Sequence, residues 1–310
     1  MQPVRRAVID IGTNSTKLLV ADVAGRFVTP VWEESEQTRL GEGFYETHLL
    51  QREAIHATAY FVAQYARIAQ SYKVVSTRVI ATSAARDALN KDELLLAIEK
   101  ASGMRVDVIS GEKEAELAFR GVNSNPTYTG QRLCIMDLGG GSTEFIVGEG
   151  EQMEFAQSFK IGGLRLQELF RPSDPPTPAE LQKCRAWLRE FVRTEVQPVL
   201  SAPLAVDTAR TTLVGTGSAA SILARMHNRI KEPDRDILES THLSLESVTQ
   251  RVEDVWSLML SDRKRLIGLP KKRADTILFS AAVYEAVMRE FGFGHLRVST
   301  RGLRYAAILD

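Results

Sequence analysis

The chain has 310 residues, of which 44% are hydrophobic and 25% are charged, and its 39 lysines and arginines balance its 39 aspartates and glutamates. This length and apolar content predict about two domains, each with its own core. The neutral charge does not indicate a nucleic-acid or membrane partner, and the only cysteines, Cys134 and Cys184, form no Cys-x-x-Cys pair, which argues against a disulfide framework or a cysteine-based zinc site.

The first third of the chain predicts an α/β domain. Residues 4–35 form three short strands in this prediction, the first two joined by a tight loop after Asp10. Apolar residues recur at helical spacing over 53–69, which predicts an amphipathic helix. A strand over 79–81 then enters a Thr82-Ser83 loop that opens a further helix.

The next helices are predicted from their boundary residues. Asn90 with Glu93 is typical of an N-cap and its reciprocal partner, and Gly103 predicts the end of that helix. A strand over 105–110 is followed by a helix over 112–122.

The polar, turn-rich tract 123–130 predicts the domain junction, so we expect domains of 1–123 and 124–310. After it the order repeats. Strands are expected over 132–160, 211–214 and 296–299, and helices starting at 162, 177 and 217, near 244–260, over 273–291 and over 301–309. The sequence therefore predicts two duplicated α/β domains around a cleft, with the terminal helix (about 301–310) packing back on the first domain.

One motif occurs twice, at residues 7–20 and 134–147. Each copy is an apolar strand that ends in an aspartate (Asp10 or Asp137), a loop with glycine and serine or threonine, and a second apolar strand. Such a loop presents backbone N–H groups and hydroxyls beside a carboxylate, a combination that suits a phosphate and a divalent cation. A single copy would be weak support, because turns favour these residues for conformational reasons, but the duplication strengthens it.

The candidate phosphate-binding residues of the two loops are Gly12, Thr13, Asn14 and Ser15 in the first copy, and Gly139, Gly140, Gly141 and Ser142 in the second. Lys17 and Glu144 follow at matching positions. They are either a phosphate-binding cation and a metal ligand or two solvated strand residues.

Further segments carry candidate residues. Glu114 lies in the first turn of a predicted helix, where a carboxylate either complements the helix dipole or activates a water that attacks phosphorus. Arginine suits phosphate through its planar fork. The remaining phosphate-binding candidates are Ser83 and Arg86, Arg165 after two glycines, and Gly215 and Gly217.

A basic run at 263–273, with Arg301 and Arg304, is a local surplus of positive charge in a neutral chain. It is either a solvated face or a track for a polyanion.

These motifs resemble the exopolyphosphatase / guanosine pentaphosphate phosphohydrolase family, in the actin–Hsp70–sugar-kinase superfamily. The resemblance runs nearly end to end, through residues 9–15, 38–43, 81–86, 109–115, 137–144, 162–166, 215–217, 273–275 and 298–304. It implies two actin-like (ribonuclease H-like) domains, in the short form of the family that lacks additional C-terminal helical domains.

By this resemblance, Glu114 is the catalytic glutamate, Asp137 and Glu144 belong to a magnesium site, and Asp10 lies alongside. Arg86, Asn14, Ser15 and the 139–142 loop match phosphate-contacting positions. Mn²⁺ is the alternative metal. Because relatives are often dimers, a homodimer is also an expectation.

No apolar run reaches the length that a membrane span requires, and we expect no signal peptide. We therefore expect a cytoplasmic enzyme.

The expected reaction is release of the terminal phosphate of inorganic polyphosphate. Guanosine pentaphosphate is the alternative substrate, because it offers the same reacting group. A superfamily kinase would need an acceptor-binding insertion, which a chain of 310 residues leaves little room for. A sensor that binds phosphate or an alarmone without turnover is the non-enzyme alternative.

Overall fold

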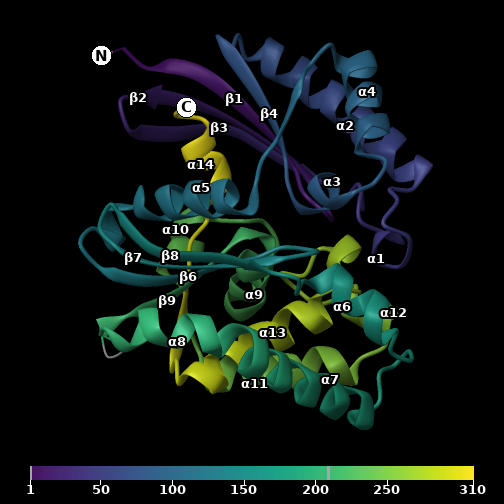
Figure 1. Ribbon diagram of the computed structural model, residues 1–310, viewed down its shortest axis with the longest axis vertical. Coiled ribbons are helices and arrows are strands. Elements are labelled where there is room, and N and C mark those ends of the chain that lie inside the picture. Colours follow the sequence, from purple (N-terminus) through teal and green to yellow (C-terminus); the bar gives the residue numbers. More distant parts are fainter. Residues whose placement is uncertain (1, 208–209) are drawn as a thin grey trace. The chain divides into compact units, whose positions relative to one another are not determined.

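The computed structural model describes residues 2–207 and 210–310. It contains two compact units, one formed by Met1–Asn125 with Arg301–Asp310 and the other by Pro126–Thr300 (Figure 1). The observed change of unit falls just after the boundary at 123/124 that the sequence suggests. The cleft expected between the domains stays a prediction. No helix in the described ranges combines the length and apolarity that a membrane crossing requires.

Unit 1 is built on a five-stranded sheet in which three parallel strands lie on one side and two strands paired in antiparallel fashion lie on the other. Its strand order is β3 (Phe27–Glu36), β2 (Thr16–Ala24), β1 (Val4–Ile11), β4 (Ser76–Ala81) and β5 (Val106–Val108). Strands β1, β2 and β3 form an antiparallel meander, whereas β4 and β5 run parallel to β1. The three strands expected at 4–35 and the strand at 79–81 are confirmed.

The two faces of this sheet carry different helices because side chains alternate along a strand. Ile9 and Leu18 pack with α2 (Arg52–Ser71) and α4 (Lys91–Ser102). Val8 and Leu19 point to the other face and pack with α5 (Gly111–Asn123) and α14 (Leu303–Ala307). The short α1 (Phe44–Thr47) and α3 (Ser83–Asp87) lie in the connections.

Unit 2 repeats the same core arrangement and extends it by one strand. Its order is β10 (His242–Ser244), β11 (His295–Val298), β9 (Thr212–Thr216), β6 (Arg132–Leu138), β7 (Thr143–Glu149) and β8 (Gln152–Phe159). Here β6, β7 and β8 form the antiparallel meander and β9 runs parallel to β6. The duplication expected from the sequence is therefore present in the topology.

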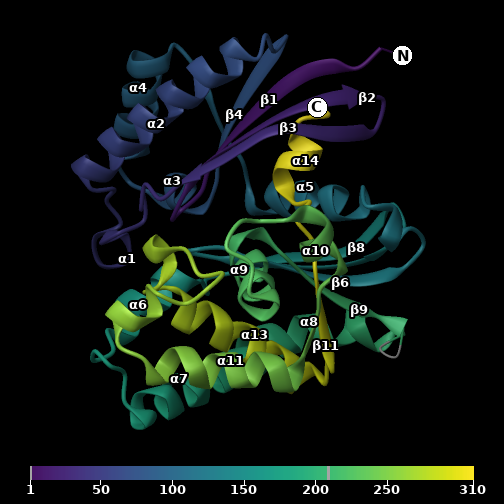
Figure 2. The same ribbon diagram turned by 180° about the vertical axis from the view of Figure 1, so that it is seen from behind.

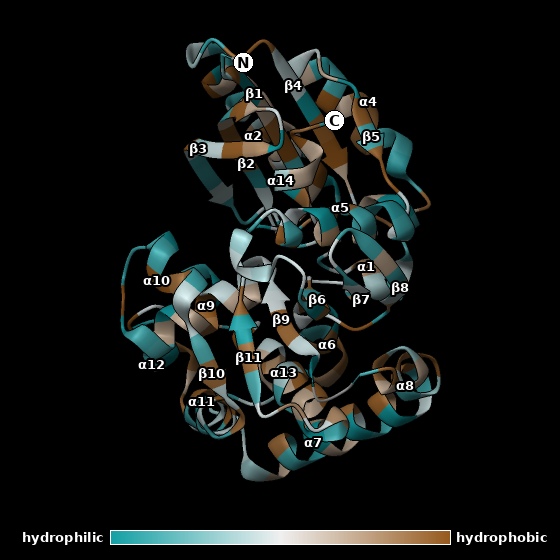
Figure 3. Ribbon diagram, turned by 90° about the vertical axis from the view of Figure 1, so that its left-hand side faces the viewer, coloured by the Kyte–Doolittle hydropathy of each residue, from teal (hydrophilic) through white to brown (hydrophobic). Residues whose placement is uncertain are grey.

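Helix α13 (Ile277–Phe291) of unit 2 has mostly buried residues. The other helices are α6 (Gly163–Phe170), α7 (Pro178–Phe191), α8 (Gln197–Ala205), α9 (Gly217–Asn228), α10 (Arg235–Ser240), α11 (Leu245–Ser257) and α12 (Leu260–Arg263). Helix α13 packs against α6, α7, α9 and α11, which can be followed in Figure 2. Hydrophilic and hydrophobic stretches alternate along the outer helix α7 (Figure 3), as expected for a helix with one buried face.

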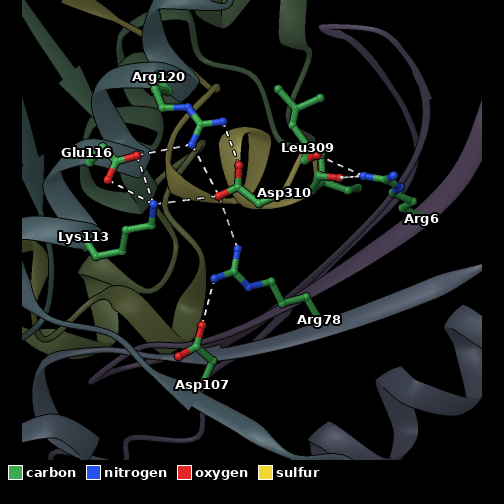
Figure 4. Close-up of polar contacts among 9 residues, drawn as sticks. Arg6, Arg78, Asp107, Lys113, Glu116, Arg120, Leu309 and Asp310 are labelled. Carbon is green, nitrogen blue, oxygen red and sulfur yellow. Dashed lines mark hydrogen bonds and ion pairs between the residues drawn. The ribbon is translucent and has the colours of Figure 1, made fainter.

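The last ten residues belong to unit 1. Helix α14 packs against α5, where a side chain on Gly121 would overlap the carbonyl of Gly302. The Arg6 guanidinium donates to the backbone carbonyls of Ile308 and Leu309 at 3.2 and 3.0 Å (Figure 4). The segment is therefore held by both packing and hydrogen bonds.

The Asp310 carboxylate lies among three cations of unit 1 (Figure 4). Arg120 donates to it at 2.8 Å, and Arg78 and Lys113 lie 3.5 and 4.0 Å from it. Burial alone would raise the pKa of Asp310, but the hydrogen bond and charge of Arg120 outweigh burial and lower it. Asp310 thus stays ionised and anchors the terminal segment.

The first turns of α7 and α4 are capped in different ways. Thr177 and Glu180 form a capping box at the start of α7, with Thr177 Oγ1 accepting from the Glu180 N–H at 3.2 Å and Glu180 accepting from the Thr177 N–H at 2.7 Å. Asn90 does not cap α4 with its side chain. Its amide instead bonds the N–H and carbonyl of Leu50 at 2.8 and 3.1 Å.

Candidate phosphate-binding and catalytic residues

The first repeated hairpin joins β1 to β2 in unit 1. Its ladder pairs Ile11 with Thr16 and Asp10 with Lys17, and the Gly12 N–H closes the loop on the Ser15 carbonyl at 3.0 Å. Thr16 is fully buried, and its hydroxyl lies 3.1 Å from that of Thr38, which joins the hairpin to the 38–41 segment.

The 38–41 segment also orients the loop's peptide groups. The carbonyls of Thr13 and Asn14 accept from the N–H groups of Gly41 and Arg39, at 2.8 and 3.2 Å. In a trans peptide the carbonyl and the following N–H point in opposite directions. The N–H groups of Asn14 and Ser15 therefore point away from the segment, as an anion-binding loop requires.

The side-chain amide of Asn14 is only partly hydrogen-bonded among the described residues. Its Oδ1 accepts from Gln37 Nε2 at 2.9 Å, whereas its buried Nδ2 has no hydrogen-bond partner within residues 2–207 and 210–310. Buried donors in folded proteins nearly always have an acceptor. This orphaned amide fits the prediction that Asn14 contacts a phosphate oxygen.

The second hairpin joins β6 to β7 in unit 2, and its loop carbonyls accept hydrogen bonds from the start of α6. The Gly139 N–H bonds the Ser142 carbonyl at 2.9 Å. The carbonyls of residues 139 and 140 accept from the first N–H groups of α6 at 2.9–3.2 Å, and that of Gly141 accepts from Arg165 Nε at 2.8 Å. The N–H groups of residues 140–142 therefore point away from α6, three in succession.

Gly162 is needed for this contact. A Cβ at Gly162 would lie 2.6 Å from the backbone of Gly140 and Gly141, closer than real side chains come. Arg165 also contacts the loop, because its Nε donates to the carbonyl of Gly141, a contact that the sequence did not reveal. The structure therefore gives Arg165 a role in fixing the loop, and direct binding of phosphate by Arg165 stays a prediction.

Two acidic residues are cross-strand neighbours at the loop end of the second hairpin. Asp137 and Glu144 are direct partners in the β6–β7 ladder, a position that brings Cβ atoms to about 4.5–5.5 Å. Glu144 is 2% exposed, and its carboxylate accepts from the Ser158 hydroxyl at 2.7 Å. Two adjacent carboxylates, one of them buried, repel each other unless a cation lies nearby.

This pair fits Mg²⁺ or Mn²⁺. Mg²⁺ in proteins usually takes one or two carboxylates and completes its octahedron with water and phosphate oxygens. The described part of the chain contains no group of three or more histidine, cysteine, aspartate or glutamate side chains arranged for a metal. In unit 1 the equivalent ladder position opposite Asp10 is Lys17, so the two copies differ in charge. A metal-binding role for Asp10 stays a prediction.

Gly217 and Gly215 border Asp137 for different reasons. Gly217 starts α9 with a φ of +80°, and a Cβ there would lie 2.7 Å from Asp137 Oδ1. Gly215 lies within β9, where a Cβ would lie 2.9 Å from the Tyr284 hydroxyl. Packing against Tyr284 thus accounts for glycine at 215, while phosphate binding by either glycine stays a prediction.

In unit 1 the structure brings Glu114 and Arg86 together, a contact that the sequence did not reveal. The side chain of Glu114 is 11% exposed, and Arg86 Nη1 donates to its Oε2 at 3.0 Å. The same Nη1 lies 3.3 Å from the carbonyl of Ile109. Arg86 is thereby fixed, and it orients the Glu114 carboxylate.

The candidates of unit 1 lie along one edge of its sheet. The Ile11 carbonyl accepts from Thr82 N–H at 3.1 Å, and the Ala81 carbonyl accepts from Ile109 N–H at 3.0 Å. These bonds place the carboxyl ends of β1, β4 and β5 side by side, with Ser83 buried at the start of α3. Ligands of open α/β sheets bind at this edge.

Glu112, the other acid in the first turn of α5, is exposed. Hydrogen bonds from the Ser110 hydroxyl, and then from the backbone N–H of Glu112 itself, lower the pKa of Glu112. A carboxylate with a lowered pKa is a weaker base, so Glu114 remains the better candidate for activating water.

Not every basic residue of the run at 263–273 is exposed at the surface. Arg263 is 4% exposed and donates to the carbonyls of Leu258 and Ala274 at 2.7 and 2.9 Å. Burial lowers its pKa. Its role is to satisfy backbone carbonyls inside unit 2, so it is not part of a track for a polyanion. Lys264, Arg265, Lys271 and Lys272 remain exposed.

Arg301 and Arg304, expected to add to the same basic surface, bind backbone in unit 1. Arg301 donates to the Ser124 carbonyl at 2.7 Å, and Arg304 donates to the Leu18 carbonyl at 2.9 Å. Both hydrogen bonds fix the segment after residue 300.

Each of the two α/β units contains a three-strand meander, a parallel strand and a glycine-containing hairpin loop. This repeat defines a duplicated, two-domain protein with actin-like folds. Comparison with known families then identifies the group. A model of the Ppx/GppA phosphatase family matches residues 19–310, and the chain belongs to that family.

Individual relatives agree with this assignment. The chain is 33% identical to Exopolyphosphatase 2 of Mycobacterium tuberculosis over 95% of this chain and 94% of that protein. It is similar to the solved structure of an exopolyphosphatase from Cytophaga hutchinsonii, with a TM-score of 0.87 and 29% identity over 97% of this chain and 96% of that one. The Aquifex aeolicus PPX-GPPA enzyme gives a TM-score of 0.79 with 28% identity over 99% of both chains.

Proposed function

We propose that this member of the family is a metal-dependent phosphoanhydride hydrolase that releases the terminal phosphate of inorganic polyphosphate. The observation that carries the proposal is the 139–142 loop, whose consecutive N–H groups point away from α6 beside the Asp137–Glu144 pair. The similarity to proteins named exopolyphosphatase supports polyphosphate as the substrate.

In this proposal the loop N–H groups and the Asn14 amide bind the oxygens of the terminal phosphoryl group. Phosphoryl transfer depends mainly on positioning and on neutralising charge, which backbone amides supply without reorganisation. Asp137 and Glu144 would hold the metal, which supplies positive charge to the phosphate oxygens when it is bound.

Glu114 activates the attacking water, and Arg86 holds Glu114 in place through the 3.0 Å ion pair. General-base assistance of this kind is worth about 10²–10⁴-fold in rate.

The test is phosphate release from polyphosphate of defined lengths by the full chain, with and without added Mg²⁺. We expect release that depends on the metal. Glu114→Gln should lower kcat by about 10²-fold or more while chain binding persists. Glu116→Gln, which changes a partly exposed acid of the same helix, is the matched control and should leave kcat within about twofold.

The outcomes separate the alternatives. Guanosine pentaphosphate presents the same terminal phosphoryl group, so release from it but not from polyphosphate would reassign the substrate. Tight binding without release from either compound would identify a sensor. Retained turnover in Glu114→Gln would remove Glu114 from the role of base.

A further inference from the structure

A row of polar residues crosses the sheet of unit 2 at the loop end of the second hairpin. Its four members are direct partners in the strand ladders, namely Thr216 in β9, Asp137 in β6, Glu144 in β7 and Ser158 in β8. Directly paired residues project from the same face of a sheet, and successive residues project from opposite faces. Met136 and Phe145 belong to the hydrophobic core of unit 2, so the row lies on the other face.

Ser158 contacts Glu144 from the side away from Asp137. Its hydroxyl donates to Glu144 Oε1 at 2.7 Å. Because β7 lies between β6 and β8, this hydrogen bond reaches Glu144 from the strand opposite to the one that carries Asp137. A hydrogen bond to a carboxylate is charge-assisted and about twice as strong as a neutral one. The last torsion of a glutamate side chain is otherwise broad, so Ser158 limits the rotation of the Glu144 carboxylate.

Unit 1 contains the same serine position without the carboxylate. Asp10, Lys17 and Ser35 are direct partners across β1, β2 and β3. They stand at the ladder positions that the last three members of the row occupy in β6, β7 and β8. A lysine ammonium has donors only, so the Ser35 hydroxyl cannot donate to Lys17. The duplication thus provides one serine opposite a carboxylate, Ser158, and an equivalent serine, Ser35, opposite a cation.

We propose that Ser158 is a positioning residue of the cation site at Asp137 and Glu144. Its hydroxyl holds the buried Glu144 carboxylate in one orientation, so that binding of the cation does not have to fix that orientation first. The inference rests on the metal dependence in the proposed function. Hydrogen bonds that orient metal ligands typically affect metal affinity by about 10–100-fold.

The experiment is Mn²⁺ binding to the full chain without substrate, measured by the electron paramagnetic resonance signal of free Mn²⁺. In Ser158→Ala the hydroxyl is lost, and we expect the dissociation constant for Mn²⁺ to rise by about 10–100-fold. Ser158→Thr keeps a hydroxyl on a residue that suits a strand, and it should recover most of that affinity. Recovery by threonine separates the hydrogen bond from a general effect of substitution in β8.

Ser35→Ala is the matched control. It is the same substitution at the equivalent ladder position of unit 1, opposite Lys17. Because no carboxylate occupies that opposite position, the Mn²⁺ affinity of Ser35→Ala should equal that of the unmodified chain.

A double-mutant cycle tests whether Ser158 acts through Glu144. Glu144→Ala removes the acceptor and should itself weaken Mn²⁺ binding. Adding Ser158→Ala to that variant should weaken binding no further, because the effects of two residues that act through one contact are not additive.

Unchanged Mn²⁺ affinity in Ser158→Ala overturns the proposal, and so does an equal loss in Ser35→Ala. A loss that Ser158→Thr does not recover, or one that persists in full beside Glu144→Ala, would assign Ser158 a role other than orienting Glu144 and overturn it as well. Failure of the proposed function gives a different result, because the unmodified chain would then release no phosphate while its Mn²⁺ binding still depended on Ser158.

Discussion

Gly217 combines two requirements that only glycine meets. Its φ of +80° lies in the left-handed region, and its missing side chain leaves room for Asp137 Oδ1. The close approach places the first turn of α9 against the carboxylate that we assign to the metal. A substitution here should therefore affect the site more than it affects the fold.

We predict that Gly217→Ala lowers Mg²⁺-dependent phosphate release by at least about tenfold, because the new methyl group displaces the Asp137 carboxylate. Gly150→Ala is the matched control, since Gly150 has a φ of +58° but no atom within 4 Å of the added Cβ. Both variants should lose about 1–2 kcal/mol of stability through the backbone conformation. Equal activity of the two variants would contradict the assignment.

Other residues show where sequence reasoning reached its limit. The repeated motif identified both hairpin loops, since its strands, aspartates and turn residues are local signals. It did not reveal that Arg86 binds Glu114 or that Arg165 bonds a loop carbonyl, because these partners depend on tertiary structure. The burial of Arg263 was missed for the same reason, as charge in the sequence does not tell an exposed arginine from one that satisfies buried carbonyls.

At the scale of elements, α7 shows how a local signal fixes a helix boundary. Glu180 completes the capping box and also accepts from the Ser173 hydroxyl and N–H, at 2.7 and 2.9 Å. The hydrogen bond from Ser173, followed by those from backbone N–H groups, lowers the pKa of Glu180 from 4.5 to about 2. The folded state therefore favours the ionised form of this carboxyl.

This shift predicts a pH-dependent stability. Because the folded-state pKa is depressed, the stabilisation is present above about pH 4.5 and is lost as pH falls toward 2. Glu180→Gln should lower the melting temperature at pH 7, and the difference from the unmodified chain should shrink on acidification. Glu190→Gln, at an exposed position of the same helix, should show no such difference at either pH.

Elements without a strong local signal were missed. Helix α8 contains Pro203 and begins with Pro198 in its first turn, where proline is tolerated, and a π-helical turn at Val192–Val196 connects it to α7. Two prolines argue against a helix when the sequence alone is considered. Asn90 was assigned to capping α4, but its bonds to Leu50, 40 positions away in the chain, take precedence.

For the whole molecule, the duplicated topology followed from the order of predicted elements, with helix and strand periodicity as its basis. Unit 1 is discontinuous, because its core includes Leu303, Tyr305 and Ile308 from the end of the chain. Within that core, Gly121 is the glycine at which an added Cβ would come nearest to another atom, the carbonyl oxygen of Gly302.

We predict that Gly121→Ala destabilises unit 1 by about 1–3 kcal/mol, because the added methyl group overlaps the Gly302 carbonyl and forces α5 and α14 apart. The measurement is urea unfolding followed by circular dichroism. Gly294→Ala adds the same methyl group with no atom within 4 Å and should change stability by less than about 0.5 kcal/mol. An equally small effect of Gly121→Ala would show that the helices adjust without cost.

The discontinuity of unit 1 also has a consequence for biosynthesis. Residues 126–300 form a contiguous unit that has all of its own strands before translation of the chain reaches Arg301. In the nascent first unit, by contrast, the apolar surface that Leu303–Ala307 covers stays exposed until this segment has been translated and has left the ribosome. A chain that stops before Leu303 would therefore keep that surface exposed, a state that chaperones and proteases recognise.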